Sequence, residues 1–330
     1  MFNETSKDIL DISMKVAEKV NHLNWKERTT EGKSILKGDN TPMPDILGEK
    51  IIIEGLEKIS YSQKIQINLI LNADKGEYYK IGKYSKDKTW AYADPVDGTI
   101  KLSGLGNDIE KGIYRIGNDG AWGIGLALTN PTTKKLEELT LNDFVNSAIV
   151  DGNPSRTSYS PENACTQINE KGKIYTAIFL ENSFLPAKNS TQENLRQGIV
   201  IFDGFQAFDR KSAPKGAENL AGTLWKRLAD RNNEGAFDIW RTYGNISCFL
   251  KNQLGFKHNS YEPQGIAYVA INENINNLVP LYWINKGAGG YSVDFNGRDL
   301  GSRRLTDKRP NVILAANKHI KDELLYLISK

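Results

Sequence analysis

The stretch WAYADPVDGTIK, residues 90–101, combines side chains that could bind a ligand with residues that constrain the backbone more densely than any other part of this chain. A strand-like run, Trp90–Ala93, leads to two carboxylates, Asp94 and Asp97, and Pro95 between them restricts the backbone so that both can face one point. Paired carboxylates suit a hard divalent cation. The Gly98-Thr99 pair permits a tight turn whose free N–H groups can point at an anion. The stretch therefore predicts a cation beside an anion, as in a phosphate-handling site.

Length and composition describe an ordinary globular protein. A chain of 330 residues favours two domains that share a cleft, and we place them at residues 1–185 and 186–330. The net charge of +3 is too small to indicate a nucleic-acid or membrane partner. Cys165 and Cys248 are far apart, so neither a disulfide framework nor a thiolate zinc site is expected. The N-terminus resembles no signal peptide and no apolar run reaches membrane-spanning length, so we expect a cytoplasmic protein.

The spacing of the apolar residues predicts a largely antiparallel sheet in the first half of the chain and a mixed α/β arrangement in the second half. A helix that Ser6 caps should come first, and a second helix should follow a loop at Lys37–Asp45. Strands such as Gln66–Leu71 and Lys173–Leu180 indicate a largely antiparallel sheet. The second half alternates strands and helices, which is typical of an α/β arrangement. The segments expected there are strands at 199–202, 265–270, 291–294 and 312–317 and helices at 221–229 and from residue 320.

Several acids outside the central stretch could complete a metal site. Asp39 and Asp45 lie in a loop, where a carboxylate serves turn formation or helix capping as readily as metal binding. Asp74 and Glu77 follow a predicted strand end, where a third oxygen ligand or a water-positioning base would be needed. The three histidines occur in unrelated contexts, so neither a zinc hydrolase nor a Ser-His-Asp enzyme is indicated.

A second anion or sugar contact is predicted at a helix start in the second half. Arg241 precedes Gly244 and Asn245, which open an apolar helical pattern. A capped structural helix explains the same residues equally well.

At this point the sequence resembles a known family. The pattern Trp90-x-x-x-Asp94-Pro95-Val96-Asp97-Gly98-Thr99 resembles the W-x-x-D-P-x-D-G-T signature of the inositol monophosphatase and fructose-1,6-bisphosphatase superfamily of magnesium-dependent, often lithium-sensitive phosphatases. The order of weaker motifs is also similar. These are an upstream acid at Asp74 or Glu77, an R-x-x-G at Arg241–Gly244, a Gly-Gly pair at 289–290 and an A-A-N at 315–317. Gly38-Asp39-Asn40 resembles the G-D-K-N segment of bacterial class II fructose-bisphosphatases, in which the aspartate binds metal.

The resemblance implies a layered αβαβα sandwich, a homodimer, and a hydrolase that needs two or three Mg²⁺ ions, with Mn²⁺ as a substitute. It implies that the metal ligands are Asp94, Asp97, the Val96 carbonyl, Asp39, Asn277 and either Asp74 or Glu77. The Gly98 and Thr99 amides would hold the phosphate, and the Thr99 hydroxyl, with Asp74 or Glu77, would orient the attacking water. Arg241, Gly244 and Asn245 would contact the substrate.

Two departures from the family pattern keep alternatives open. The family's late W-D aspartate corresponds to Asn277, whose amide oxygen is a neutral and weaker ligand, so that the second metal is loose or Glu273 substitutes for it. The family's E-A-G-G appears as Gly287-Ala288-Gly289-Gly290.

The first hypothesis is a phosphomonoesterase acting on a sugar or cyclitol phosphate. The alternatives are a 3′(2′),5′-bisphosphate nucleotidase of the same superfamily and a non-catalytic phosphosugar-binding or regulatory protein.

Overall fold

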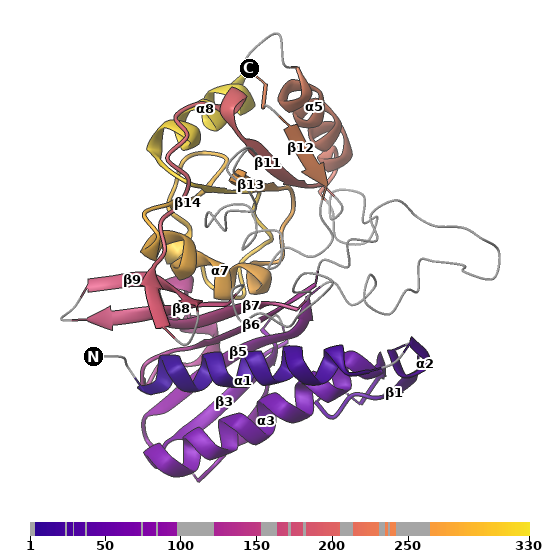
Figure 1. Ribbon diagram of the computed structural model, residues 1–330, viewed down its shortest axis with the longest axis vertical. Helices are drawn as coiled ribbons and strands as arrows, with labels where there is room; N and C mark the ends of the chain where they lie inside the picture. The colour runs from indigo at the N-terminus through magenta and orange to yellow at the C-terminus, as the bar shows by residue number, and fades with distance from the viewer. Residues whose placement is uncertain are drawn as a thin grey trace.

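Figure 1 shows the computed structural model of the chain, whose strands form two large sheets. The structure describes residues 4–23, 25–28, 30–36, 38–73, 75–83, 85–97, 122–152, 164–170, 173–180, 183–204, 214–230, 235–236, 238–241 and 265–330.

The first sheet has eight strands in the order β10-β9-β8-β7-β6-β5-β3-β4. Neighbouring strands are antiparallel except for β3 and β5, which run parallel. Most consecutive strands lie side by side, as antiparallel pairing allows. The predicted antiparallel sheet is thus confirmed. Its strands are β3 (Gln66–Asn72), β4 (Glu77–Ile81), β5 (Lys88–Asp97), β6 (Gly123–Leu128), β7 (Asn146–Asp151), β8 (Ala164–Glu170), β9 (Lys173–Leu180) and β10 (Ser183–Pro186).

The second sheet has five strands in the order β12-β11-β13-β15-β14. Its first three strands are parallel, and the pairs β13-β15 and β14-β15 are antiparallel, so the expected mixed arrangement is confirmed. The predicted domain boundary at residue 185 remains a prediction. The strands are β11 (Ile199–Asp203), β12 (Asp238–Arg241), β13 (Gly265–Ala270), β14 (Tyr291–Asp294) and β15 (Val312–Ala315), and a separate pair is formed by β1 (Glu31–Lys33) and β2 (Asn40–Pro42).

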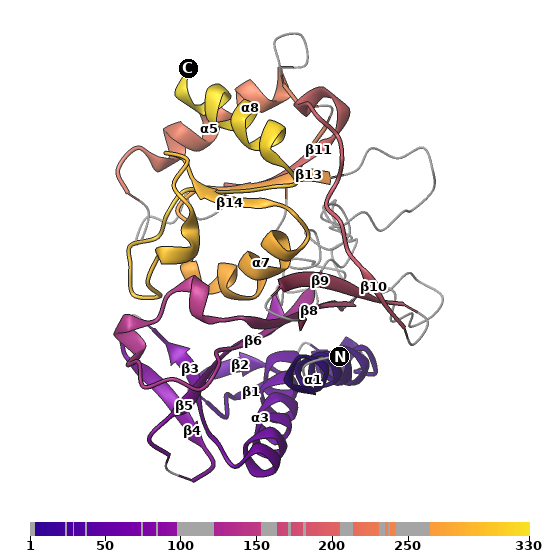
Figure 2. The same cartoon turned by 90° about the vertical axis from the view of Figure 1, so that its left-hand side faces the viewer.

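Helices and sheets alternate in five layers, which Figure 2 shows edge-on. Helices α1 and α3 cover the outer face of the first sheet, α7 lies between the two sheets, and α5 and α8 cover the outer face of the second sheet. This is the αβαβα order expected from the sequence. The helices are α1 (Glu4–Asn21), α2 (Trp25–Arg28), α3 (Met43–Gln63), α5 (Ala217–Ala229), α7 (Ile275–Gly287) and α8 (Lys318–Ser329), with short 3₁₀ turns η1 (Leu136–Glu138), η2 (Leu141–Asp143), η4 (Leu195–Gln197) and η6 (Leu300–Ser302).

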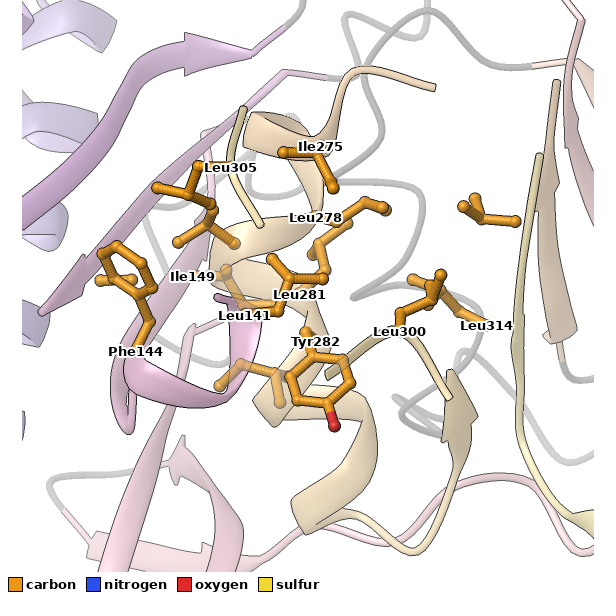
Figure 3. Packing of buried hydrophobic residues seen from close by; sticks show 14 of the residues in the cluster. Leu141, Phe144, Ile149, Ile275, Leu278, Leu281, Tyr282, Leu300, Leu305 and Leu314 are labelled. Atoms are coloured by element: carbon orange, nitrogen blue, oxygen red, sulfur yellow. The ribbon is translucent and has the colours of Figure 1, made fainter. Parts of the chain in front are cut away.

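Apolar cores fill the spaces between the layers. Helix α7 is buried on several sides, as expected for a helix with apolar residues around its circumference, and its Leu278 and Leu281 pack between Ile149 of the first sheet and Leu314 of the second (Figure 3). This middle core fixes the two sheets relative to each other. None of the helices in the described ranges is long and apolar enough to span a membrane.

Two local predictions are wrong. Ser6 lies inside α1 instead of capping it, and its buried hydroxyl donates to Asn146 Oδ1 at 3.4 Å. The predicted loop at Lys37–Asp45 contains strand β2, and α3 begins already at Met43. Pro44 stands in the first turn of α3, where its missing N–H costs nothing and its fixed φ suits a helix.

Gly287 marks a close approach between α7 and the first sheet. The Thr176 hydroxyl on β9 donates to the Ile284 carbonyl at 2.6 Å, and a Cβ at Gly287 would lie 2.6 Å from Thr176 Oγ1 and 2.8 Å from Thr176 N. These distances are too short for a carbon, and the strand backbone cannot move aside cheaply. Gly287→Ala is therefore expected to lower the free energy of unfolding by about 1–3 kcal/mol, measured by urea denaturation.

Gly222 in α5 provides the matched control. It is exposed, and a Cβ there would meet nothing within 4 Å. Gly222→Ala is expected to raise the free energy of unfolding by about 0.4–1 kcal/mol, because alanine has the higher helix propensity and restricts the unfolded chain. Equal responses of the two variants would contradict the close approach at Gly287.

Candidate active site

A pocket of about 420 Å³ lies where the first sheet and α3 meet two loops of the second sheet. Its walls combine carboxylates with apolar side chains, and one arginine and one asparagine come from the second-sheet side. The lining residues are Leu36, Asp39, Thr41, Asp45, Glu49, Ile52, Leu69, Ile70, Leu71, Tyr92, Ala93, Asp94, Pro95, Asn274 and Arg309.

An irregularity in β5 turns Asp94 toward this pocket. Asp94 pairs with Gly125 of β6 and Asp97 with Gly123, so three steps along β5 match two along β6. Pro95, which has no N–H to give the ladder, stands in this bulge, a position where proline is tolerated in a strand. As a result Asp94 and Pro95 line the pocket while the Val96 side chain is buried in the core under α1 and α3.

Helix α3 brings two more carboxylates to the same pocket. Asp45 and Glu49 are four residues apart, so they lie on one face of the helix. Between them Gly48 permits a close approach, since a Cβ there would lie 2.8 Å from Pro95 Cβ and 3.3 Å from Pro95 O. The signal for these acids was their helical spacing, which the loop interpretation of residues 37–45 concealed.

The carboxylate of Glu49 already has protein donors. It accepts hydrogen bonds from the Ser34 hydroxyl at 2.9 and 3.0 Å and from the Ile35 N–H at 2.9 Å. Glu49 is buried, so these bonds offset the cost of removing its charge from water. Glu49 thus holds the segment after β1 against α3.

Asp39 lies on the exposed side of the pocket, just before β2. Its Oδ1 accepts a hydrogen bond from the Thr41 hydroxyl at 3.0 Å. Both residues line the pocket, and the Ser34 N–H holds the Asp39 carbonyl at 2.9 Å. The structure therefore brings together Asp39, Asp45 and Asp94, which the sequence analysis named, with Glu49, which it did not.

Asn277 belongs to a buried hydrogen-bond network around Glu273. Asn277 Nδ2 donates to Glu273 Oε1 at 2.9 Å, the Asn274 N–H donates to the same oxygen at 2.9 Å, and the Tyr268 hydroxyl donates to Glu273 Oε2 at 2.5 Å. Burial, followed by repulsion from Asp203, raises the pKa of Glu273 to about 7, although these hydrogen bonds oppose the shift. Because its Nδ2 serves Glu273, Asn277 keeps Oδ1 as the atom available to a cation. Neither Asn277 nor Glu273 lines the pocket; Asn274 does.

Of the other predicted site residues, the structure describes two, Glu77 and Arg241. Glu77 is exposed at the start of the edge strand β4, opposite Asn72, and does not line the pocket. Arg241 ends β12, beside Phe202 of β11, at the edge where the parallel strands of the second sheet terminate. The predictions for Asp74, Gly98, Thr99, Gly244 and Asn245 fall outside the described residues, as does the side chain of Asp97.

The donor set of the pocket fits a hard cation such as Mg²⁺. Carboxylate, hydroxyl and amide oxygens line it, and neither histidine nor cysteine is present in that lining. Within the described ranges, however, no three acidic, histidine or cysteine side chains come close enough together to hold a metal ion.

Solved structures of known proteins have the same fold. Over 99% of both chains, the structure is similar to the extragenic suppressor protein SuhB from Bartonella henselae, with 17% sequence identity and a TM-score of 0.60. It is also similar to the Thermotoga maritima IMPase, with 15% identity over 97% of this chain and 94% of the other and a TM-score of 0.56. The fructose-1,6-bisphosphatase of Leishmania major gives a TM-score of 0.60 with 11% identity over 98% of this chain and 93% of its own.

Sequence comparison alone finds less. No family model and no curated protein matches this sequence. The structural likeness covers nearly the full length of each chain, and the layers match those that the central motif implied. The chain therefore has the fold shared by inositol monophosphatases and fructose-1,6-bisphosphatases.

Proposed function

We propose that this protein is a Mg²⁺-dependent phosphomonoesterase that hydrolyses a sugar or cyclitol phosphate. The observation that carries the proposal is the pocket in which Asp94, from the Asp94-Pro95-Val96-Asp97 bulge, lies with the carboxylates of α3. The fold of known phosphatases supports the same reaction class. A volume of about 420 Å³ suits a monosaccharide-sized substrate.

Different residues would bind the cation and the substrate. Asp94, Asp97 and the Val96 carbonyl would hold Mg²⁺ on β5, and Asp39 and Asp45, which line the same pocket, would offer further carboxylates. The chemistry supplied by Mg²⁺ in such a site is charge neutralisation at the phosphate oxygens and a lower pKa for water.

The protein itself would position the phosphate and the attacking water. The amides of Gly98 and Thr99 would bind phosphate oxygens, as free N–H groups at a turn do. The Thr99 hydroxyl, together with Asp74 or Glu77, would orient the water, and the carboxylate of Asp74 or Glu77 would accept its proton. Apolar side chains of the lining, such as Ile52 and Leu69, exclude bulk water and so strengthen each of these polar interactions.

A phosphate-release screen tests this function. Full-length protein is incubated with inositol phosphates, fructose bisphosphate, sugar 1-phosphates and nucleotide 3′-phosphates, with Mg²⁺ or with EDTA. Release from a sugar or cyclitol phosphate that stops in EDTA is expected. Exclusive release from nucleotide 3′-phosphates would replace the proposal with the nucleotidase alternative, and no release from any compound, despite ligand binding, would replace it with a non-catalytic binding protein.

We further propose a cytoplasmic homodimer that binds Mg²⁺ or Mn²⁺. The proposal follows from the family resemblance of the central motif. Light scattering in solution tests the assembly: twice the chain mass of 36.9 kDa is expected, and a single chain mass at micromolar concentration would contradict it.

A further inference from the structure

Arg309 is the one cationic side chain among the described residues that line the pocket. It faces a lining that contains four carboxylates, those of Asp39, Asp45, Glu49 and Asp94. It comes from the loop before β15, so it reaches the pocket from the second sheet, whereas the carboxylates all come from the first-sheet side. The pocket is thus asymmetric in charge.

The backbone around Arg309 is held by the neighbouring loop. The Glu273 N–H donates to the Pro310 carbonyl at 2.8 Å, and the Asn272 N–H donates to Asn311 Oδ1 at 2.9 Å. Pro310 is buried, and Val312 begins β15, an inner strand of the second sheet. Arg309 is therefore presented from a fixed backbone, which reduces the entropy lost when its side chain binds a ligand.

We infer that Arg309 binds the phosphate group of the substrate, an inference that rests on the proposed function. A guanidinium presents paired N–H donors that match two phosphate oxygens, and it stays charged at every working pH. Carboxylates on one wall attract cations, so an anion is best accommodated between those cations and the opposing arginine. Neither of the anion contacts expected from the sequence, the Gly98-Thr99 turn and the Arg241 segment, includes this residue.

The competing role for Arg309 is that of a counter-ion to the pocket carboxylates. The two roles predict opposite changes when the charge is removed. If Arg309 contacts phosphate, the variant without its charge binds phosphate more weakly. If Arg309 is only a counter-ion, it competes with Mg²⁺ for the same carboxylates, so removing its charge leaves the phosphate affinity unchanged and tightens Mg²⁺ binding.

Calorimetric titration of full-length protein with inorganic phosphate at saturating Mg²⁺, and separately with Mg²⁺, distinguishes them. Arg309→Gln is expected to weaken phosphate binding about 10- to 100-fold, the loss typical of hydrogen bonds to a charged group. For the substrate found in the release screen, KM should rise by a similar factor while kcat changes less. Arg309→Lys should recover part of the loss, because lysine restores the charge without the paired donors.

Lys308→Gln is the matched control, since Lys308 is the adjacent cation but is exposed and outside the pocket lining. It should bind phosphate like the wild type. Circular dichroism establishes that each variant is folded. Unchanged phosphate affinity in folded Arg309→Gln, or wild-type protein that binds no phosphate, overturns the inference. Phosphate binding needs no turnover, so wild-type protein that binds phosphate but hydrolyses nothing refutes the proposed function alone.

Discussion

Asp94→Asn is expected to reduce kcat/KM for Mg²⁺-dependent phosphate release by about 10²–10³. The replacement is nearly isosteric, so the bulge at Pro95 and the pairing with Gly125 should persist. It removes one negative charge from a partly buried position in the pocket. A neutral amide oxygen is a poorer ligand for a hard dication, and a loss of several kcal/mol of charge stabilisation corresponds to that factor in rate.

The control for this variant is Asp87→Asn. Asp87 directly precedes β5, is exposed, and does not line the pocket. Its activity and its Mg²⁺ affinity, measured by calorimetry, should match those of the wild type. If Asp94→Asn retained both the activity and the Mg²⁺ affinity of the wild type, the assignment of the β5 bulge as a metal site would be wrong.

Several strands and helices of this fold were predictable because their signals are local, whereas the order of the layers was implied by the family resemblance of the central motif. Strands β9 and β13 have the bounds that the sequence predicted. Strand β13 is buried along its whole length, so its sequence is apolar throughout and can be recognised without knowledge of its neighbours.

The bulge in β5 is a feature of the candidate site that neighbouring residues in the sequence indicate. Pro95 between two aspartates predicted a restricted backbone there, and the strand register does change between Asp94 and Asp97. That both carboxylates face one point stays a prediction, because the Asp97 side chain lies outside the described residues. Proline acts on its own residue and the one before it, so its effect can be inferred from the sequence.

The rest of the pocket depends on contacts between distant segments. Asp45 and Glu49 reach it because α3 begins at Met43 and Gly48 packs against Pro95, a contact across 47 residues of sequence. Arg309 and Asn274 reach it because a loop before β15 is hydrogen-bonded to the loop after β13. No periodicity records such a contact, and only the assembled layers bring these side chains together.

The same reason explains the misinterpreted role of Ser6. A serine near the start of an amphipathic helix usually caps it, but here its hydroxyl is used inside the helix to contact β7 through Asn146. Tertiary contact overrides the local preference.

Wild-type protein is expected to lose stability as the pH rises from about 5 to about 8, and Glu273→Gln is expected to remove this loss. Burial and the neighbouring Asp203 raise the pKa of Glu273 from 4.5 to about 7 in the folded protein. Between those two values the folded state binds more protons than the unfolded state, so the free energy of unfolding falls as the pH rises. The contribution is fully present below about pH 4.5 and is lost above about pH 7, with an upper magnitude of about 3 kcal/mol.

Glutamine can keep the geometry of this network without the charge. Its Oε1 can accept from the Asn274 N–H and from Asn277 Nδ2, and its Nε2 can donate to the Tyr268 hydroxyl oxygen. Urea denaturation in EDTA across pH 5–8 should therefore give a flatter profile for Glu273→Gln, which becomes the more stable protein at pH 8. A wild-type profile that is already flat over this range would contradict the assignment of Glu273 as the titrating carboxyl.

Glu49→Gln is the contrasting variant, because Glu49 is a buried carboxylate that accepts hydrogen bonds from two protein donors. An amide keeps the bond from the Ile35 N–H and can turn its N–H₂ group to the Ser34 hydroxyl oxygen, but both bonds lose the strength that the carboxylate charge gives them. Glu49→Gln should lower the free energy of unfolding by about 1–3 kcal/mol. The fall of this free energy between pH 5 and 8 should remain as in the wild type. Opposite responses of two buried glutamates to the same substitution would show that their hydrogen-bond partners, and not burial alone, decide whether the charge is tolerated.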